Sequence, residues 1–283
     1  MVATRDAGPV CGHLAPYLDT RLRSRVTSPP LPRPRRTWRR PTVGEAVRSS
    51  LAWAWSMLVF SIAPVSSVLT LGLFGPALTT FWAHAWGRPT LWLMGIKVEV
   101  RGIEHLRVPG SRIVVANHQS ALDMPLFAMI VPRAPLVLAK AELRWLFPFN
   151  VMWVALGQRF VDRRNPEAAR RSVAALVEAL RREERSVVLA PEGTRSRTGE
   201  LGPFKLGAFH MAVETGVPMV PVCFHGVGGL MPPGRWWAEA GRCVVEVHPP
   251  IETKGWTADH VHEYADALRA DYVRWLAAEA ANP

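Results

Sequence analysis

One stretch decides how this chain folds, and it reads Ile113-Val114-Val115-Ala116-Asn117-His118-Gln119-Ser120-Ala121-Leu122-Asp123. Its first four residues form an apolar run that is typical of a buried strand. Ser120 suits a helix N-cap, and Asp123 at the third helical position suits the positive end of the helix dipole. We therefore expect a strand that ends in a short turn and passes directly into a helix.

The spacing of His118 and Asp123 restricts how the two can meet. On one continuous helix their side chains would point about 140° apart, because each residue turns the helix by about 100°. They meet only if His118 lies on the turn and Asp123 lies in the first helical turn. Asp123 would then hold His118 in one tautomer and leave its other nitrogen free to take a proton. The pair predicts a general base, and the alternative is a loop histidine with no catalytic role.

From about residue 96, short apolar runs alternate with helical patterns. The expected strands are 97–100, 113–116, 136–139, a short one within 157–164, 186–189, 219–224 and 244–247. The expected helices begin after the N-caps Ser120 and Asn165, and near Val261. This alternation predicts an α/β domain over residues 93–283, with a mixed, largely parallel sheet flanked by helices. In such sheets, sites form where strands end and loops begin.

The first 48 residues have a different composition. They contain ten Arg, seven Pro and three acidic residues, and little apolar material, so residues 1–48 are expected to be a disordered basic arm. One interpretation places this arm on anionic lipid, and the other is an extension without a function. The whole chain carries a formal charge of +11, which favours anionic partners.

Residues 49–92 are expected to form a membrane-associated helical segment. Residues 49–87 contain no Lys, Arg, Asp or Glu, although about 20 residues suffice to cross a bilayer once. Tryptophans cluster toward the two ends, at Trp53, Trp55, Trp82, Trp86 and Trp92. Because Arg48 and Arg88 flank the stretch, we expect a hairpin that dips into the cytoplasmic leaflet and returns. A single crossing and a buried pair of helices are the alternatives.

Cationic residues follow several of the expected strands. Arg163 ends one strand, Arg195 lies in Pro191-Glu192-Gly193-Thr194-Arg195-Ser196, and Lys205 follows in Phe204-Lys205-Leu206-Gly207. Guanidinium groups bind phosphate in bidentate fashion, and Gly193 and Thr194 would let backbone and hydroxyl donors approach the same anion. The alternatives are a solvated Arg163–Arg164 pair and a Glu192–Arg195 salt bridge. The three cysteines are scattered without metal-ligand spacing, so no metal is expected.

Four stretches, in this order, resemble the motifs of the glycerolphospholipid acyltransferases, in particular the bacterial 1-acylglycerol-3-phosphate acyltransferases. The first motif, N-H-x4-D, is matched by Asn117, His118 and Asp123, and the second, G-x-x-F-I-x-R, by Gly157, Phe160 and Arg163 with Val161 in place of Ile. The third, F-P-E-G-T-R-S, is matched by 191–196 with Ala190 in place of Phe, and the fourth, V-P-[IV]-[IV]-P-V, by 217–222 with Met219 as a variant. The resemblance covers about residues 50–225.

The resemblance implies a direct acyl transfer. His118 would remove the proton from the free hydroxyl of a lysophospholipid, with Asp123 orienting it, and the oxygen would attack the thioester of acyl-CoA or acyl-carrier protein without an acyl-enzyme. The helix N-terminus near Ser120 would stabilise the oxyanion. The residues implied to surround the phosphate or glycerol are Arg163, Glu192, Gly193, Thr194 and Arg195, with Lys205 as a helper and Lys140 as a weaker candidate.

The resemblance also implies where the enzyme works. The product would be phosphatidate, made from 1-acyl-sn-glycerol-3-phosphate at the inner (cytoplasmic) membrane, with the catalytic domain facing the cytoplasm and no cofactor beyond the acyl donor. Residues 51–87 and 145–156 would form the face through which acyl chains enter, although 145–156 suits an ordinary core equally well.

Two other functions remain open at this point. One keeps the chemistry and changes the acceptor, for example to lyso-ornithine lipid. The other is a basic protein that binds nucleic acid or membrane surfaces. The binding protein leaves unexplained why His118, Asp123 and Arg195 lie at strand ends, and the long uncharged stretch does not suit a nucleic-acid binder. We therefore expect no nucleic-acid partner.

Overall fold

The computed structural model describes residues 39–71, 73–131, 135–162, 166–182, 185–196 and 200–280. Most of the expected arm, together with the candidate Arg163, lies outside these ranges. Helix α2 (Val43–Leu69) begins earlier than the expected boundary at residue 49. The reason is a capping box, in which Thr42 Oγ1 accepts from Glu45 N at 3.3 Å and Glu45 Oε2 accepts from Thr42 N at 2.8 Å.

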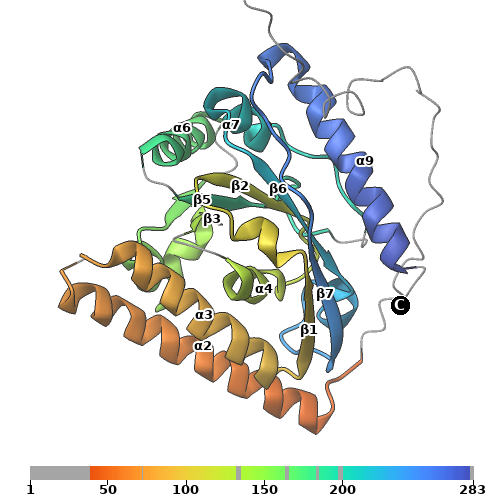
Figure 1. The fold of residues 1–283 in the computed structure, drawn as a ribbon. Helices are drawn as coiled ribbons and strands as arrows, with labels where there is room; N and C mark the ends of the chain where they lie inside the picture. Colours follow the sequence, from red (N-terminus) through yellow and green to blue (C-terminus); the bar gives the residue numbers. More distant parts are fainter. Residues whose placement is uncertain are drawn as a thin grey trace, which may run out of the picture.

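A mixed seven-stranded sheet forms the centre of the molecule (Figure 1). Its strands are β1 (Ile96–Arg101), β2 (Arg112–Ala116), β3 (Leu136–Lys140), β4 (Arg159–Val161), β5 (Ser186–Leu189), β6 (Met219–His225) and β7 (Gly241–Val247). Their order across the sheet is β1-β7-β6-β2-β5-β3-β4. Every neighbouring pair is parallel except β6 and β7. The predicted mixed, largely parallel sheet is therefore confirmed.

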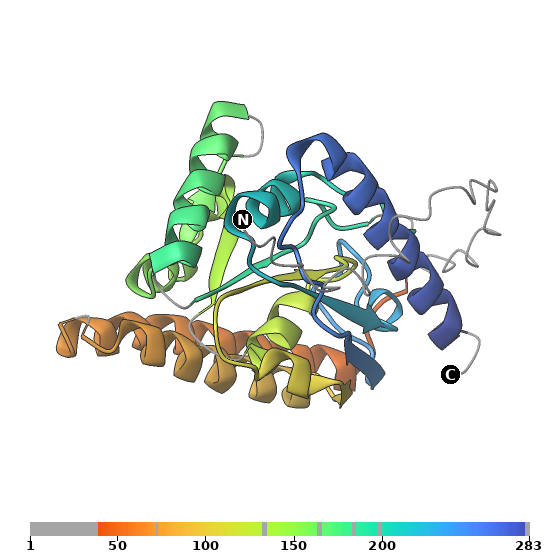
Figure 2. The same cartoon turned by 45° about the horizontal axis from the view of Figure 1, so that its top comes forward.

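Helices cover both faces of the sheet (Figures 1 and 2). On one face lie α6 (Pro166–Arg182), α7 (Gly207–Thr215) and α9 (Val261–Ala280), and on the other lie α4 (Asp123–Ile130) and the N-terminal helices. The short elements are 3-10 turns at Ile103–Leu106, Ala141–Trp145 (η2) and Ala258–His260, and helices α5 (Phe149–Ala155) and α8 (Val227–Leu230). All five residues of β2 are buried, because this central strand contributes to the apolar core on both faces.

The N-terminal helices α2 and α3 (Gly75–Leu93) form the predicted hairpin, which lies as a separate layer in Figure 2. Three of its tryptophans were expected at headgroup level but instead donate across the hairpin: Trp55 to Ala85 O at 3.1 Å, Trp82 to Ser66 Oγ at 2.8 Å and Trp86 to Ser56 Oγ at 2.9 Å. Each of these indole N–H groups thus forms a hydrogen bond with an oxygen atom of the opposite helix, where both helices are otherwise apolar.

One side of the hairpin is docked and the other is exposed. α3 approaches α4 so closely at Gly87 that an added Cβ would lie 2.5 Å from Pro125 O. The outer side of α2 instead presents Val47, Leu51, Leu58, Ile62, Val65, Val68 and Leu69, each more than 40 % exposed. Among the described residues, α2 is the one helix whose length and composition would allow it to cross a membrane.

Candidate active site

Asn117 fixes the point at which β2 turns away from the sheet. Its Nδ2 donates to Phe224 O at 2.9 Å, and its Oδ1 accepts from Phe224 N at 2.8 Å. The buried amide therefore takes the place of a further backbone pair with β6. His118 follows directly and lies on the turn.

The predicted contact between His118 and Asp123 is present. His118 Nδ1 lies 2.7 Å from Asp123 Oδ2, the aspartate side chain is fully buried, and the histidine side chain is 23 % exposed. A carboxylate at Nδ1 fixes the proton there and leaves Nε2 as the nitrogen that can accept one. The geometry suits a general base that is open to a substrate on one side.

The helix start differs from the expected one. α4 begins at Asp123 itself, with Leu122 as an N-cap that makes no side-chain hydrogen bond. Asp123 Oδ2 accepts from Gln119 N at 2.7 Å and from Ser120 N at 2.9 Å, whereas Ser120 Oγ donates to Met231 O at 2.8 Å. The N–H groups of Gln119 and Ser120 are thus taken by the aspartate, and the expected oxyanion site at this helix start stays a prediction.

Glu192 holds the same turn from the other side. Its Oε1 accepts from His118 N at 2.8 Å and its Oε2 accepts from Gly202 N at 2.9 Å. Burial raises the pKa of this carboxyl, and the two N–H groups oppose the rise. Among the described residues Glu192 forms no ion pair with Arg195, so the alternative salt bridge between them is not present there. The Glu192 carboxylate binds two backbone N–H groups and is not placed to contact a phosphate. The side chain braces the backbone of His118.

The loop after β5 brings a cation to the site. Gly193 has φ +70°, and an added Cβ would lie within 3 Å of three Lys205 side-chain atoms, with Nζ at 2.7 Å. Lys205 N donates to Pro191 O at 2.7 Å, and Ser196 N donates to His118 O at 2.8 Å. The loop is thus bound to the catalytic turn, and the lysine side chain lies over its glycine.

The other candidate cations divide into two groups. Arg195 and Lys205 are exposed, as is the neutral Thr194, and within the described ranges neither cation has an ion-pair partner. Lys140 instead pairs with Glu142 at 3.0 Å and does not line the cavity beside His118. The structure therefore gives Lys140 no place in the site.

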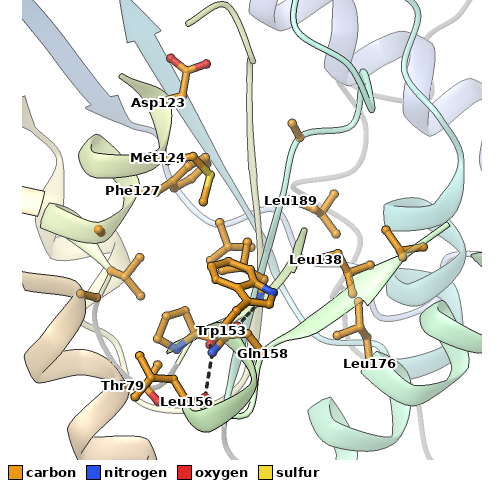
Figure 3. Close-up of a pocket in the computed structure, with 18 of the residues that line it drawn as sticks. Thr79, Asp123, Met124, Phe127, Leu138, Trp153, Leu156, Gln158, Leu176 and Leu189 are labelled. Atoms are coloured by element: carbon orange, nitrogen blue, oxygen red, sulfur yellow. Dashed lines mark hydrogen bonds between the residues drawn. The ribbon is translucent and has the colours of Figure 1, made fainter. Parts of the chain in front are cut away.

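An apolar cavity of about 340 Å³ adjoins the two catalytic candidates, within the range of about 300–1,000 Å³ that is usual for small-molecule sites. Figure 3 shows Asp123 at one end of the lining and Thr79 and Leu156 at the other. Lys205 and Gly193 also line it, and the remaining walls come mainly from apolar side chains of α2, α3, α4, β3, α5, α6 and α7.

Two polar side chains at the far end of the cavity are hydrogen-bonded to the backbone. Thr79 Oγ1 donates to Gly75 O at 2.8 Å. Gln158 Nε2 donates to Pro135 O at 2.8 Å, and its Oε1 accepts from Val137 N at 2.8 Å; both side chains are labelled in Figure 3. Sequence reasoning singled out neither residue, because Thr79 lies in the uncharged stretch 49–87 and Gln158 occupies a variable position of the second motif. Residues 145–156 contribute Met152, Trp153 and Leu156 to the walls, so this segment is part of the cavity.

The chain was compared with known proteins. A family model described as "Acyltransferase" matches residues 97–225. A 1-acyl-sn-glycerol-3-phosphate acyltransferase of Salmonella typhimurium is 36% identical over 187 residues, covering 66% of this chain and 75% of the relative. An enzyme of the same name from Cocos nucifera is 28% identical over 228 residues, or 81% of this chain and 71% of the relative.

A solved structure agrees with these relatives. The 1-acyl-sn-glycerophosphate acyltransferase of Thermotoga maritima superposes with a TM-score of 0.69 at 26% identity, covering 83% of this chain and 96% of that one. Together with the apolar length of α2, the bacterial relatives indicate association with a membrane. The chain belongs to the acyltransferase family, among the 1-acyl-sn-glycerol-3-phosphate acyltransferases.

Proposed function

We propose that this enzyme transfers a fatty acyl chain from acyl-CoA or acyl-carrier protein to the free hydroxyl of 1-acyl-sn-glycerol-3-phosphate and so forms phosphatidate. The observation that carries the proposal is the pair of His118 and Asp123, with Nδ1 and Oδ2 2.7 Å apart, at an apolar cavity of about 340 Å³. An acyl chain needs such a cavity, and a hydroxyl nucleophile needs a base of this kind.

The proposed reaction is one displacement. His118 Nε2 takes the hydroxyl proton as the oxygen attacks the thioester carbonyl carbon, the carbon–sulfur bond breaks, and the proton then passes to the leaving thiolate. An acyl-enzyme has no support, because Cys223 and Cys243 are buried and the Ser120 hydroxyl is bound to Met231 O. Within the part of the chain that is described, no other side chain hydrogen-bonds to the His118 ring.

The exposed cations favour a phosphate-bearing acceptor. Lys205 borders the cavity, and Arg195 lies on the loop that is bound to His118 through Ser196. Exposed cations beside a catalytic base suit a phosphomonoester better than a zwitterionic headgroup such as that of lyso-ornithine lipid. Arg163, Gly193 and Thr194 belong to the proposed headgroup site as well. No metal ion or cofactor is required by this chemistry.

The proposed location is the inner (cytoplasmic) membrane, with the catalytic domain facing the cytoplasm, where acyl thioesters are made. The exposed apolar side of α2 supports attachment, and Trp92, at 76 % exposure, suits the headgroup level. The hairpin would dip into one leaflet and return.

The first test replaces the catalytic pair. His118→Ala should lower kcat by about 10²- to 10⁴-fold, with the melting temperature unchanged, because the side chain is partly exposed and makes one hydrogen bond. Asp123→Asn should also lower kcat, because the amide can leave His118 in the wrong tautomer. His260→Ala is the control, since this exposed histidine lies beside Glu263 at the start of α9. Full activity of His118→Ala would exclude the mechanism.

The second test identifies the acceptor. Transfer of a labelled acyl group should be measured to lysophosphatidate, lyso-ornithine lipid and lysophosphatidylcholine, each with both thioester donors. Arg195→Ala should chiefly raise KM for lysophosphatidate, because it removes a cation and leaves the base in place. An unchanged KM would remove Arg195 from the headgroup site.

A further inference from the structure

A second apolar surface lies outside the N-terminal hairpin, on η2 and α5. We call it the Trp145 patch, and its exposed residues are Leu143 36%, Trp145 83%, Leu146 50%, Phe147 75%, Val151 45% and Val154 63%. A cluster of this size and exposure marks an interaction surface on most proteins.

The patch is held on a rigid support. On the inner face of α5, Phe149 stacks on Trp153 at 5.0 Å between ring centroids and contacts Phe60 of α2 edge-on at 5.6 Å. Met152 and Trp153 line the cavity from the same face. Because one face of α5 is packed in this way, the side chains on its opposite face remain exposed.

The charged residues around the Trp145 patch indicate what kind of partner it binds. Residues 140–159 contain Lys140, Arg144 and Arg159 against Glu142 alone. Glu142 pairs with Lys140, whereas Arg144 and Arg159 are exposed and have no ion-pair partner within the described ranges. An aromatic and aliphatic cluster beside exposed arginines suits the headgroup and acyl boundary of an anionic bilayer. A second copy of this chain suits it poorly, because each copy carries +11.

We propose that the Trp145 patch inserts into an anionic phospholipid bilayer and gives the enzyme a second point of attachment beside the α2–α3 hairpin. The patch adjoins α2 through the contact of Phe149 with Phe60. Because α5 lines the cavity with its other face, insertion would place the cavity wall against the leaflet that holds the acceptor. This role rests on the proposed function, whereas the insertion itself does not.

Insertion is tested by a depth measurement on the full chain. An environment-sensitive fluorophore is attached at Trp145→Cys in a Cys11→Ser background, because Cys223 and Cys243 are buried. With phosphatidylglycerol vesicles that contain lipids spin-labelled along the acyl chain, we expect strong quenching at position 145. The same label at His260→Cys should stay unquenched, since this site lies at the start of α9 and its side chain is 51% exposed. No quenching at 145 together with quenching at Leu58→Cys would overturn the proposal.

A functional measurement separates attachment from chemistry. Trp145→Ser combined with Phe147→Ser should lower turnover of lysophosphatidate embedded in vesicles by about tenfold, and should leave turnover of a short-chain soluble acceptor unchanged. Val108→Ser is the matched control, because Val108 is also exposed, at 54%, and lies in another loop. Equal losses on both acceptors would contradict a membrane role for the patch.

The two measurements fail in different ways. If the wild-type chain transfers no acyl group to any lysolipid, the proposed function fails while quenching at position 145 still reports insertion. If the patch instead joins two copies, the double variant will abolish a dimer seen by sedimentation in detergent, and the proposal is then wrong.

Discussion

Three side chains fix the backbone of the turn that carries His118, and each does so by hydrogen bonds to main-chain atoms. Asn117 pairs with Phe224, Asp123 accepts from the N–H groups of the turn, and Glu192 accepts from His118 N. A base whose backbone is held on both sides loses little freedom when substrate binds, which is the basis of preorganised catalysis. The sequence motif predicted Asp123 as the partner of the His118 ring. It did not predict that Glu192 would hold the backbone of His118.

The raised pKa of Glu192 predicts a dependence of stability on pH. A folded-state pKa above the ordinary 4.5 means that the folded protein binds this proton more tightly than the unfolded chain does. The contribution of Glu192 to the free energy of unfolding is therefore largest at acidic pH, and it decreases as pH rises above about 4.5 toward the folded pKa. The melting temperature of the wild type minus that of Glu192→Gln should decrease over this range in calorimetry. A constant difference would contradict the assignment.

Gly193 predicts a change of substrate affinity. Gly193→Ala introduces strain at φ +70° and a methyl group against the aliphatic part of Lys205, so the lysine must move. We expect KM for lysophosphatidate to rise by roughly tenfold, with about 1 kcal/mol lost from the free energy of unfolding. Gly255→Ala is the control, because φ is +84° there and nothing lies within 4 Å of the added Cβ. Equal KM values in both variants would exclude this role of Lys205.

Burial predicts that two thiols are inert. The pKa of Cys243 is raised to about 11, chiefly by burial and secondarily by Asp123, and that of Cys223 is raised further by burial. Both should stay neutral and unreactive toward Ellman's reagent at about pH 8 until the protein unfolds. Mass spectrometry of the labelled protein, before and after denaturant, locates the modified positions. Labelling of either thiol in the native protein at this pH would contradict the burial of both side chains.

At the scale of elements, the hairpin and helix α4 form one unit. α3 touches α4 at Gly87, where an added Cβ would lie 2.5 Å from Pro125 O and 2.8 Å from Met129 N. Asp123 is the first residue of the same α4. A shift of α3 must therefore move the helix that holds Asp123, the proposed partner of the base.

This contact can be tested within one helix. Gly87→Ala should cost roughly 1–3 kcal/mol of stability, because backbone atoms cannot yield easily, and it should lower kcat by displacing Asp123. Gly75→Ala, in the same helix, has nothing within 4 Å of its added Cβ and should be neutral or mildly stabilising. Thermal unfolding and acyl transfer measured on both variants give the comparison. A loss of stability with unchanged kcat would show that the position of the hairpin does not influence catalysis.

Sequence patterns predicted the strands better than their arrangement. Apolar runs marked β2, β5 and β6 because buried strands must be apolar, and this is a local property. The order of the strands and the antiparallel pairing of β6 with β7 depend on contacts between distant residues, which no local pattern encodes. The cavity escaped prediction for the same reason, since its walls come from nine different helices and strands.

At the scale of the whole molecule, charge and apolar surface should act together. The chain carries +11, and exposed apolar residues cover the outer side of α2 and the Trp145 patch. Binding to phosphatidylglycerol vesicles should therefore weaken, without disappearing, as salt rises from about 0.05 to 0.5 M, because screening removes the electrostatic part only. Vesicle sedimentation measures this. Binding that vanishes at high salt would show that the apolar surfaces do not insert.

The hydrogen bonds around the turn also determine when the site can form during synthesis. Asn117 needs Phe224, 107 residues later in the chain, and Ser120 needs Met231, 111 residues later. Met231 lies beyond the region 97–225 that the family model matches. A nascent chain halted at residue 225 would contain all four sequence motifs and lack the carbonyl that holds Ser120. The ribosome must therefore release most of this protein before the turn that carries His118 can form all of its hydrogen bonds.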